Sequence, residues 1–182
     1  MTNVTEKTRG TPAITAAPVT GSSPAEDDLL LEQQLCFALT VASRSVVGAY
    51  KPVLDTLGLT HPQYLVMLCL WESSPRSVRD ISEALAQEPA TISPLLRRLE
   101  TAGFITRQRR DGNERTLDVR LTAAGAALRQ RALAVPGTMM AKLGLTRDQV
   151  AALHASMTDL IAATRLATTH TTEAAPGDAP RR

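Results

Sequence analysis

The cysteines and histidines are the side chains of this sequence best suited to chemistry, and they are few. Cys36 and Cys69 are the two cysteines among 182 residues, whereas a small secreted domain held by disulfides would carry several pairs. The three histidines, His61, His154 and His170, lie far apart and form no metal-ligand spacing. We therefore predict reduced thiols in a cytoplasmic protein, with no metal site, no cofactor and no enzymatic centre.

Arginine is concentrated in one stretch of the chain. Between Arg97 and Arg120 there are seven arginines and four acidic residues, a local net charge of +3 in 24 residues, although the whole chain carries only +2. Such a cluster can bind the phosphates of a nucleic acid. It can equally be a solvated face, because arginines outnumber lysines 17 to 3 throughout the sequence. The order of the surrounding elements decides between these interpretations.

Composition places one domain at residues 27–166. Residues 1–26 and 167–182 are rich in Thr, Ala, Pro, Gly and Ser without periodicity, so both are predicted to be disordered tails. The chain is 43% hydrophobic but only 3% aromatic, which predicts an aliphatic and mainly helical core. The longest apolar run, 64–71, is far shorter than the roughly 20 residues that span a bilayer.

The first predicted helix is apolar on more than one face. Asp27 and Asp28 can begin it, and its apolar residues keep helical spacing as far as Tyr50, where Lys51-Pro52 bends or ends the helix. A helix with so much apolar surface at the edge of a small domain is expected to pack against a second subunit.

Two short helices and a tight turn are predicted in the middle of the chain. Thr60 caps a helix that holds the apolar run, and 77–80 forms a capping box that opens the next helix. After a turn, residues 89–101 form a helix that exposes small polar residues and arginine and ends at Gly103. The last two helices are typical of a helix-turn-helix.

A basic β-hairpin is predicted directly after this helix. Residues 104–110 lead into an Asp111-Gly112 turn, and 116–121 alternates with Leu117, Val119 and Leu121 on one face. A helix small enough for the major groove, beside a basic hairpin that can reach the minor groove or phosphates, is typical of a winged helix. This order of elements favours DNA binding over a solvated arginine face.

Two more helices complete the predicted domain. One runs from Thr122 to about Ala134, where 135–137 breaks it, and Thr146 caps a terminal helix that ends near Leu166. The fold class expected is mainly α with a small β wing, in which a winged helix-turn-helix domain lies between N- and C-terminal helices.

Six short segments occur in an order that is specific as a set. They are LCFAL at 35–39, YKPVLD at 50–55, PQYL at 62–65, LWE at 70–72, TISPLLRRLE at 91–100 and LTAAG at 121–125. Together they resemble the MarR family, and more narrowly its OhrR branch, which senses organic hydroperoxides. The resemblance covers about residues 29–137.

This resemblance implies a homodimeric repressor whose N- and C-terminal helices are dimerisation helices and which binds a pseudo-palindromic operator in double-stranded DNA. It also implies that Cys36 is oxidised by an organic hydroperoxide and that oxidation releases the DNA. We further hypothesise that the oxidised Cys36 forms a mixed disulfide with a low-molecular-weight thiol. Tyrosines surround the sensing thiol in the branch: Tyr50 stands at one such position, while Thr40 and His61 replace two others. In the wing, Asn113 replaces an expected aspartate two positions before Arg115.

The residues predicted to contact DNA lie on the second helix of the helix-turn-helix and on the hairpin. The hydroxyl groups can donate to phosphates or bases, and an arginine on the helix can reach a guanine edge. An arginine near the hairpin tip suits a narrow, electronegative minor groove. The set is Thr91, Ser93, Pro94, Arg97, Arg98, Arg109, Arg110 and Arg115.

A sensing thiol must react as the thiolate and remain accessible. Cys36 is predicted some two turns inside its helix, where the terminal dipole is weak. Tyr50 is 14 positions further along, about 21 Å at 1.5 Å per residue, so it cannot reach Cys36 within one straight helix. We therefore hypothesise that Tyr50 and His61 of a second chain approach Cys36, with His61 offering a hydrogen bond or, when protonated, a positive charge.

Other interpretations stay open. Cys36 can be a small buried hydrophobe, which is the commonest fate of a free cysteine, and Cys69 within its apolar run is expected to serve packing. The repressor can instead be relieved by a small phenolic or carboxylate ligand without redox chemistry. A thiol peroxidase and a winged helix used only for protein contacts are the remaining alternatives.

Overall fold

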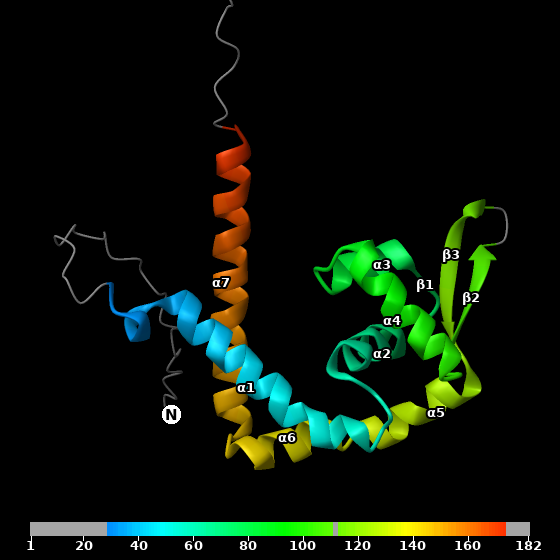
Figure 1. The fold of residues 1–182 in the computed structure, drawn as a ribbon, viewed down its shortest axis with the longest axis horizontal. Coiled ribbons are helices and arrows are strands. Elements are labelled where there is room, and N and C mark those ends of the chain that lie inside the picture. Colours follow the sequence, from blue (N-terminus) through cyan, green and yellow to red (C-terminus); the bar gives the residue numbers. More distant parts are fainter. Residues whose placement is uncertain (1–28, 111–112, 174–182) are drawn as a thin grey trace, which may run out of the picture. The chain divides into compact units, whose positions relative to one another are not determined.

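The structure, a computed structural model, describes the backbone of residues 29–110 and 113–173 and the side chains of residues 29–109 and 117–167. The chain separates into two compact units, residues 1–41 and 42–182. In the first unit, the described part holds the 3₁₀ turn η2 (Leu31–Gln33) and the start of α1 (Leu35–Asp55). The remaining elements belong to the second unit, and Figure 1 labels the helices and strands of the chain. They are α2 (His61–Glu72), β1 (Arg76–Ser77), α3 (Val78–Ala84), α4 (Pro89–Thr101), β2 (Ile105–Arg110), β3 (Asn113–Leu121), α5 (Ala123–Ala132), α6 (Val135–Leu143) and α7 (Arg147–Glu173).

The mainly helical fold with a small sheet confirms the predicted winged-helix class. The sheet is antiparallel in the order β1-β3-β2, and the wing, which is the β2–β3 hairpin, pairs from Ile105 opposite Leu121. A bulge separates Arg109 from Arg110. The two-residue strand β1 was not predicted, because it is too short to show alternation and it precedes a strong helix-start signal. It pairs Arg76 with Val119 at the root of the wing.

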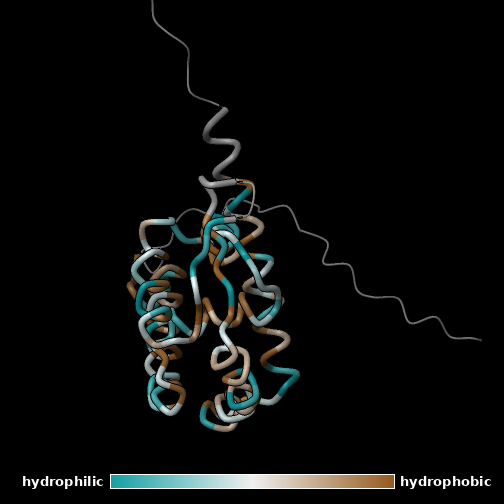
Figure 2. The backbone as a smooth tube through the Cα atoms, turned by 90° about the vertical axis from the view of Figure 1, so that its right-hand side faces the viewer, coloured by the Kyte–Doolittle hydropathy of each residue, from teal (hydrophilic) through white to brown (hydrophobic). Residues whose placement is uncertain are grey.

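The core of the second unit lies where α2, α3, α4 and the wing root meet. In Figure 2 the hydrophobic parts of the chain recur as brown stretches within the helices, as amphipathic helices require. Each fully buried aliphatic side chain stabilises the fold by roughly 1.5–3 kcal/mol relative to exposure. The fully buried set includes Leu54, Val66, Met67, Leu70, Ile81, Ile92, Leu96, Leu99, Ile105 and Val119.

The predicted helix starts of α2 and α3 are confirmed by their capping hydrogen bonds. The backbone N–H of Thr60 donates to Oε1 of Gln63 at 2.8 Å. At α3, the N–H of Ser77 donates to a carboxylate oxygen of Asp80 at 3.0 Å, and the N–H of Asp80 donates to Oγ of Ser77 at 3.1 Å. These bonds satisfy backbone donors that a helix otherwise leaves unpaired.

Ser77→Ala is expected to destabilise the protein by about 1 kcal/mol, because the Asp80 N–H loses its acceptor and Ser77 is buried. Urea unfolding followed by circular dichroism measures this change. The matched variant Ser77→Thr keeps the acceptor and should lose less. Equal loss in both variants would contradict the capping role.

The first helix differs from its prediction at both ends. The expected caps Asp27 and Asp28 lie outside the described residues, and α1 begins only at Leu35, after η2 and an extended Gln34. At the other end α1 passes through Pro52 without stopping. Proline there removes one hydrogen bond within the last turn, and the full burial of Leu54 just beyond it favours the helical continuation.

The C-terminal half contains a helix that was not predicted. Residues 135–137 were expected to break the preceding helix, but the break between α5 and α6 lies at Leu133-Ala134. Pro136 occupies the first turn of α6, where a backbone N–H has no partner within the helix and its absence removes no hydrogen bond. The terminal helix α7 begins where Thr146 predicted it, and it continues past Leu166 to Glu173. The boundaries proposed for the tails remain predictions.

Two helices expose apolar side chains that the chain itself does not cover. Among the side chains described in α7, none is buried. The exposed apolar residues of α1 are Leu35, Phe37, Val41, Val46 and Val47, and those of α7 are Val150, Leu153, Met157, Ile161 and Leu166. None of the helices within 29–110 and 113–173 is long and apolar enough to cross a membrane.

Candidate DNA-binding surface and thiol site

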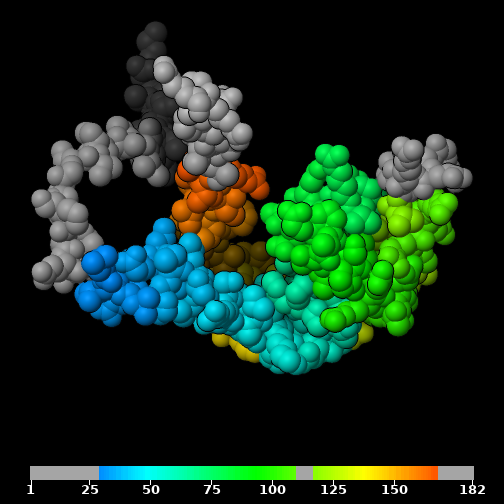
Figure 3. Space-filling view, turned by 45° about the horizontal axis from the view of Figure 1, so that its top comes forward, coloured from blue at the N-terminus to red at the C-terminus, as the bar shows by residue number. Residues whose placement is uncertain are grey.

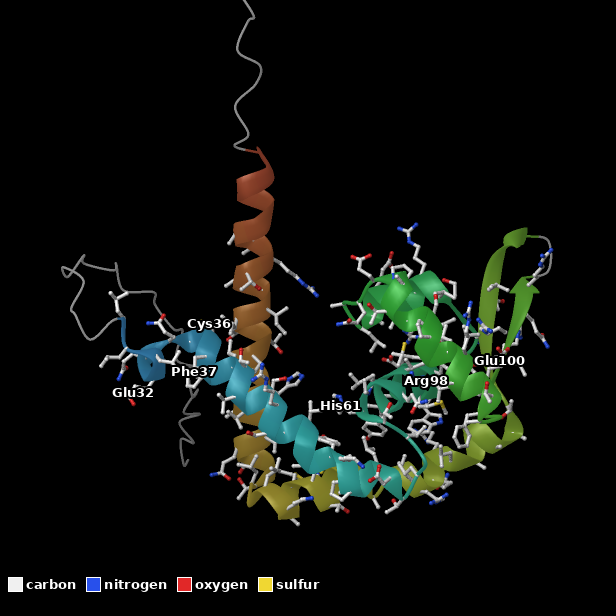
Figure 4. The ribbon with its side chains drawn as sticks, in the orientation of Figure 1. Glu32, Cys36, Phe37, His61, Arg98 and Glu100 are labelled. Atoms are coloured by element: carbon white, nitrogen blue, oxygen red, sulfur yellow. The ribbon has the colours of Figure 1, made fainter. Side chains whose placement is uncertain are left out.

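Helix α4 presents the face that the sequence predicted. Its buried side carries Ile92, Leu96 and Leu99, which hold it against the core. The opposite side exposes Thr91, Pro94, Arg97 and Arg98. Figure 4 labels Arg98 and Glu100 on this helix, and in Figure 3 the green surface of α3 and α4 adjoins the yellow-green surface of the wing. A helix anchored in this way leaves one polar, positively charged face free for a ligand.

Ser93 differs from its prediction as an exposed DNA donor. It is only partly exposed, and its Oγ donates to the backbone oxygen of Pro89 at 2.8 Å. A hydroxyl has one proton to donate, so in this conformation that proton is used within the helix. The Oγ atom keeps lone pairs that can accept a hydrogen bond.

The turn between α3 and α4 fixes where α4 begins. Ala86 adopts a positive φ of 50°, and the N–H of Gln87 donates to the backbone oxygen of Ser82 at 2.9 Å. The predicted proline at the turn, Pro89, is the first residue of α4. The fixed φ angle of proline suits the first position of a helix, so Pro89 stabilises the start of α4 directly after the turn.

The wing carries arginines in two different situations. Arg107 binds Glu100 through its guanidinium group, with Nη2 and Nε at 2.5 and 2.9 Å from Oε2, whereas Arg109 is exposed. Arg110 and Arg115 belong to the strands by their backbones, but their side chains lie outside the described part of the structure. The predicted Asp111-Gly112 turn lies outside the described residues.

One side of β3 differs from the prediction. Val119 is fully buried as expected, but Leu117, assigned to the same inward face, is 41% exposed because it lies further out along the hairpin. Asp118 on the opposite face is 4% exposed, with Nη2 of Arg120 at 3.4 Å from its carboxylate. Alternation alone could not show that this acidic side chain is buried.

The start of α5 is packed tightly against the end of α4 and the wing. Thr122 donates from its hydroxyl to the backbone oxygen of Gly103 at 2.6 Å, and it accepts from the N–H of Gly125 at 3.0 Å. The indole N–H of Trp71 donates to the backbone oxygen of Gly125 at 2.8 Å. These bonds connect α2, α5 and the segment that joins α4 to the wing, and the sequence predicted only the Thr122 cap among them.

The two thiols lie in contrasting surroundings. Cys36 is exposed and is the second residue of α1, so the prediction that it lies two turns inside the helix is wrong. The hydroxyl of Thr40, one turn later, donates to the backbone oxygen of Cys36 at 2.8 Å. Cys69 is buried as expected, and burial raises the pKa of its thiol despite the nearby Arg76 guanidinium.

An aromatic cluster gathers two of the predicted sensor residues in the second unit. The ring centroids of Tyr50 and His61 are 5.4 Å apart in an edge-to-face arrangement, and those of Tyr50 and Tyr64 are 6.2 Å apart. Tyr64 in turn lies 6.3 Å from Trp71. Burial lowers the pKa of His61 from its ordinary value, so the imidazole is neutral at neutral pH. Thr40 and Cys36 belong to the first unit.

A cavity of about 260 Å³ adjoins this cluster and α4. His61, Pro62 and Leu65 line it from α2, Leu85 and Gln87 from the end of α3 and the turn, and Thr91, Ile92 and Leu95 from α4. Its lining is mainly apolar. No group of three or more potential metal ligands occurs among the residues the structure describes.

Comparison with known proteins identifies the family of this chain. The model of the MarR family matches residues 59–117. The organic hydroperoxide resistance transcriptional regulator of Bacillus subtilis is 43% identical over 122 residues, which cover 67% of this chain and 81% of that protein.

Solved structures show the same fold. Reduced AbfR bound to DNA superposes with a TM-score of 0.62 at 28% identity, over 74% of this chain and 94% of that one. The repressor CouR bound to a 23-mer DNA duplex gives a TM-score of 0.67 at 24% identity, over 77% and 99% of the two chains. With 43% identity to the Bacillus regulator and a matching family model, the chain belongs to the MarR family.

Proposed function

We propose that the protein is a homodimeric transcriptional repressor that binds duplex DNA and releases it when Cys36 is oxidised by an organic hydroperoxide. The observation that carries the DNA part is the exposed face of α4, with Arg97 and Arg98, next to a wing that exposes Arg109. The fold that presents this face is shared with DNA-bound AbfR. The redox part is supported by the identity to a hydroperoxide resistance regulator and by the exposed Cys36.

In this proposal each subunit inserts α4 into a major groove while the wing reaches the adjacent backbone or minor groove. Two such helices must lie about 34–36 Å apart, one helical turn of DNA. Arg97 is long enough for a guanine edge, and Pro94 and Thr91 offer apolar contact to thymine methyl groups. The neighbouring arginines supply the sequence-independent attraction to phosphates.

The exposed apolar residues of α1 and α7 are proposed to be buried by a second copy of the chain. An isolated protein rarely exposes so many large apolar side chains on two helices, and in α7 those at positions 150, 153, 157 and 161 recur at helical spacing. A two-fold dimer would bury these side chains and present two copies of α4 to one duplex. Dimerisation therefore sets the distance between the two copies of α4.

The proposed chemistry at Cys36 begins with attack of the thiolate sulfur on the terminal oxygen of the hydroperoxide. The O–O bond breaks, the sulfur becomes a sulfenic acid, and the departing alkoxide takes a proton to leave as an alcohol. A small thiol can then replace the hydroxyl group, giving a mixed disulfide and water. The thiol reacts once for each regulatory event, so the protein is not an enzyme in this proposal.

The position of Cys36 in the first turn of α1 favours this reaction. Backbone N–H groups in a helix's first turn stabilise nearby negative charge, and Cys36 is the second residue of the helix. We propose that Tyr50 and His61 from the second subunit complete the site around the thiolate. Because burial lowers the pKa of His61, we infer that its imidazole donates a hydrogen bond as the neutral form.

The DNA part of the proposal predicts that Arg97→Ala weakens specific duplex binding. Loss of a base contact costs about 1–3 kcal/mol, roughly 5- to 150-fold in affinity. Fluorescence anisotropy with the duplex that flanks the protein's own gene measures the effect. Arg129→Ala, which removes an exposed arginine from α5, is the matched control and should bind normally. If the unaltered protein binds no duplex even at low salt, the proposed function fails.

A ligand-relieved repressor is the second candidate function. It is favoured by the apolar cavity of about 260 Å³ between His61 and α4 and by the replacement of two expected tyrosines by Thr40 and His61. A phenolic carboxylate that fills the cavity would shift α4 without any change at sulfur. Titrating the DNA complex with salicylate and, separately, with cumene hydroperoxide distinguishes the candidates: the redox proposal predicts release by the hydroperoxide alone.

A further inference from the structure

We propose that Glu100 and Arg107 form a positioning pair that holds the wing against α4, so that Arg107 acts within the protein and not on DNA. This inference rests on the proposed DNA binding and adds a residue pair that determines how well the two DNA-contacting elements act together. It gives two of the wing arginines different roles: Arg107 shapes the surface, and Arg109 is exposed and available for DNA.

Three hydrogen bonds join the two residues. Glu100 lies in the last turn of α4 and Arg107 is the third residue of β2. Oε1 of Glu100 accepts from the backbone N–H of Arg107 at 3.2 Å, and Oε2 accepts from Nε at 2.9 Å and from Nη2 at 2.5 Å. One carboxylate thus binds both the main chain and the side chain of the first wing strand (Figure 4 labels Glu100).

This ion pair differs in burial from the exposed pair on α3. The Arg107 and Glu100 side chains are 26% and 36% exposed, compared with 85% and 62% for Arg79 and Glu83. Fully exposed ion pairs contribute little to the stability of a protein. Charge-assisted hydrogen bonds between a planar guanidinium and a carboxylate are stronger than neutral hydrogen bonds and are geometrically specific. The hydrogen bonds from Arg107 also lower the pKa of Glu100, so the carboxylate stays charged at neutral pH.

The chain between the two residues explains why such a pair is needed. Helix α4 ends at Thr101, Gly103 takes a positive φ of 77°, and β2 begins at Ile105. The wing therefore leaves the helix through a very short connection. The Glu100–Arg107 bonds add a second attachment beyond that connection, and they fix the direction in which β2 extends from α4.

Fixing this direction matters because α4 and the wing have to engage one duplex together. A wing that is free to change its angle to α4 loses conformational entropy when DNA fixes it. This loss makes the free energy of binding less favourable and lowers the affinity. The guanidinium of Arg107 is already engaged in this arrangement, since two of its nitrogens donate to the Glu100 carboxylate. In this proposal Arg107 is therefore expected to add no phosphate contact of its own.

Glu100→Gln separates this proposal from a purely electrostatic effect, because the two predict opposite changes in the affinity for DNA. Removing a negative charge beside the DNA-binding face strengthens attraction to a polyanion. Loss of the positioning pair weakens specific binding, since the amide NH₂ group that replaces one oxygen cannot accept from the guanidinium. We expect specific affinity to fall about tenfold, a typical size for coupled neighbours, with an unchanged slope of log K against log salt.

The experiment compares duplex binding at several salt concentrations for Glu100→Gln, Arg107→Gln and the double variant. The proposal expects similar losses in both single variants and no further loss in the double variant. Glu83→Gln removes the same charge from an exposed pair and should not weaken binding. Arg109→Gln should reduce the salt slope by about 1, as loss of a phosphate contact does, whereas Arg107→Gln should not.

The proposal is overturned if Glu100→Gln binds as tightly as the unaltered protein or more tightly, or if Arg107→Gln lowers the salt slope as Arg109→Gln does. Thermal unfolding checks that each variant is folded. Should a glutamine variant not fold, Arg107→Lys is measured in the same way. It keeps the positive charge but lacks the planar guanidinium with its paired donors, so it should also lose affinity for DNA. Absence of duplex binding by the unaltered protein would instead reject the proposed function.

Discussion

Gly125→Ala should destabilise the protein by about 3 kcal/mol or more, at the upper end of what overpacking costs. A Cβ atom at this position would lie 2.0 Å from the backbone oxygen of Phe104 and 2.9 Å from its carbonyl carbon. These are main-chain atoms, so no side-chain rotation can relieve the clash. The α5 start would have to move away from the segment that joins α4 to the wing.

That movement would break bonds on both sides of Gly125. The N–H of Gly125 donates to Thr122 and its oxygen accepts from Trp71. Trp71 is the single tryptophan of the chain, so its fluorescence reports on this junction directly while urea unfolding measures the stability. The red shift expected in folded Gly125→Ala protein would show that the indole had lost its partner.

Gly137→Ala is the matched control for this prediction. Gly137 lies in α6, and a Cβ atom added there would meet no heavy atom within 4 Å beyond its chain neighbours and the backbone of its own helix. Alanine favours helix over glycine by up to about 1 kcal/mol, so this variant should be at least as stable as the original. If both substitutions left the stability unchanged, the tight junction between α5 and Phe104 would be contradicted.

Cys36→Ser should leave the reduced protein able to bind DNA but should abolish release by organic hydroperoxide. Cys36 is exposed and far in sequence from α4, so the substitution removes no proposed DNA contact. Serine has no nucleophilic sulfur to attack the peroxide bond. We expect the dose of cumene hydroperoxide that halves DNA binding to rise by at least about a hundredfold, as expected when the reactive thiol is removed.

Cys69→Ala is the control variant for the sensing thiol. Cys69 is 6% exposed, and burial raises the pKa of its thiol, which keeps it protonated and slow to react. This variant should release DNA at the same hydroperoxide dose as the unaltered protein. Release that depends on Cys69 and not on Cys36 would show that the sensing thiol had been assigned to the wrong residue.

Local sequence signals predicted the elements that position α4. The capping box at Ser77 and the helix end at Gly103 each depend on residues within a few positions, so a short sequence pattern is enough to predict them. The buried face of α4 follows from helical spacing for the same reason. Helix α6 was missed because Pro136 signals a break when read alone, and only the packing of Val135 and Met139 shows that a new helix begins there.

The parts of the site that the sequence did not predict depend on contacts across elements. The pairing of Glu100 with Arg107 spans a helix end, a turn and a strand start, so helical or strand periodicity cannot show it. Asp118 is buried and pairs with Ser77 of β1, a strand whose two residues carry no strand pattern. The depth of Cys36 was wrong because the sequence pattern placed the helix start at Asp28, whereas the extended Gln34 delays it to Leu35.

The central claim is that oxidation of Cys36 and loss of DNA are one event. It is tested most directly by following both in the same sample, with anisotropy for the bound duplex and mass spectrometry for the peptide that contains Cys36, as hydroperoxide is added. We predict that the released fraction rises together with the oxidised fraction of Cys36 while Cys69 stays reduced. DNA release that is complete while Cys36 is still a thiol, or full oxidation of Cys36 with the duplex still bound, would contradict the account.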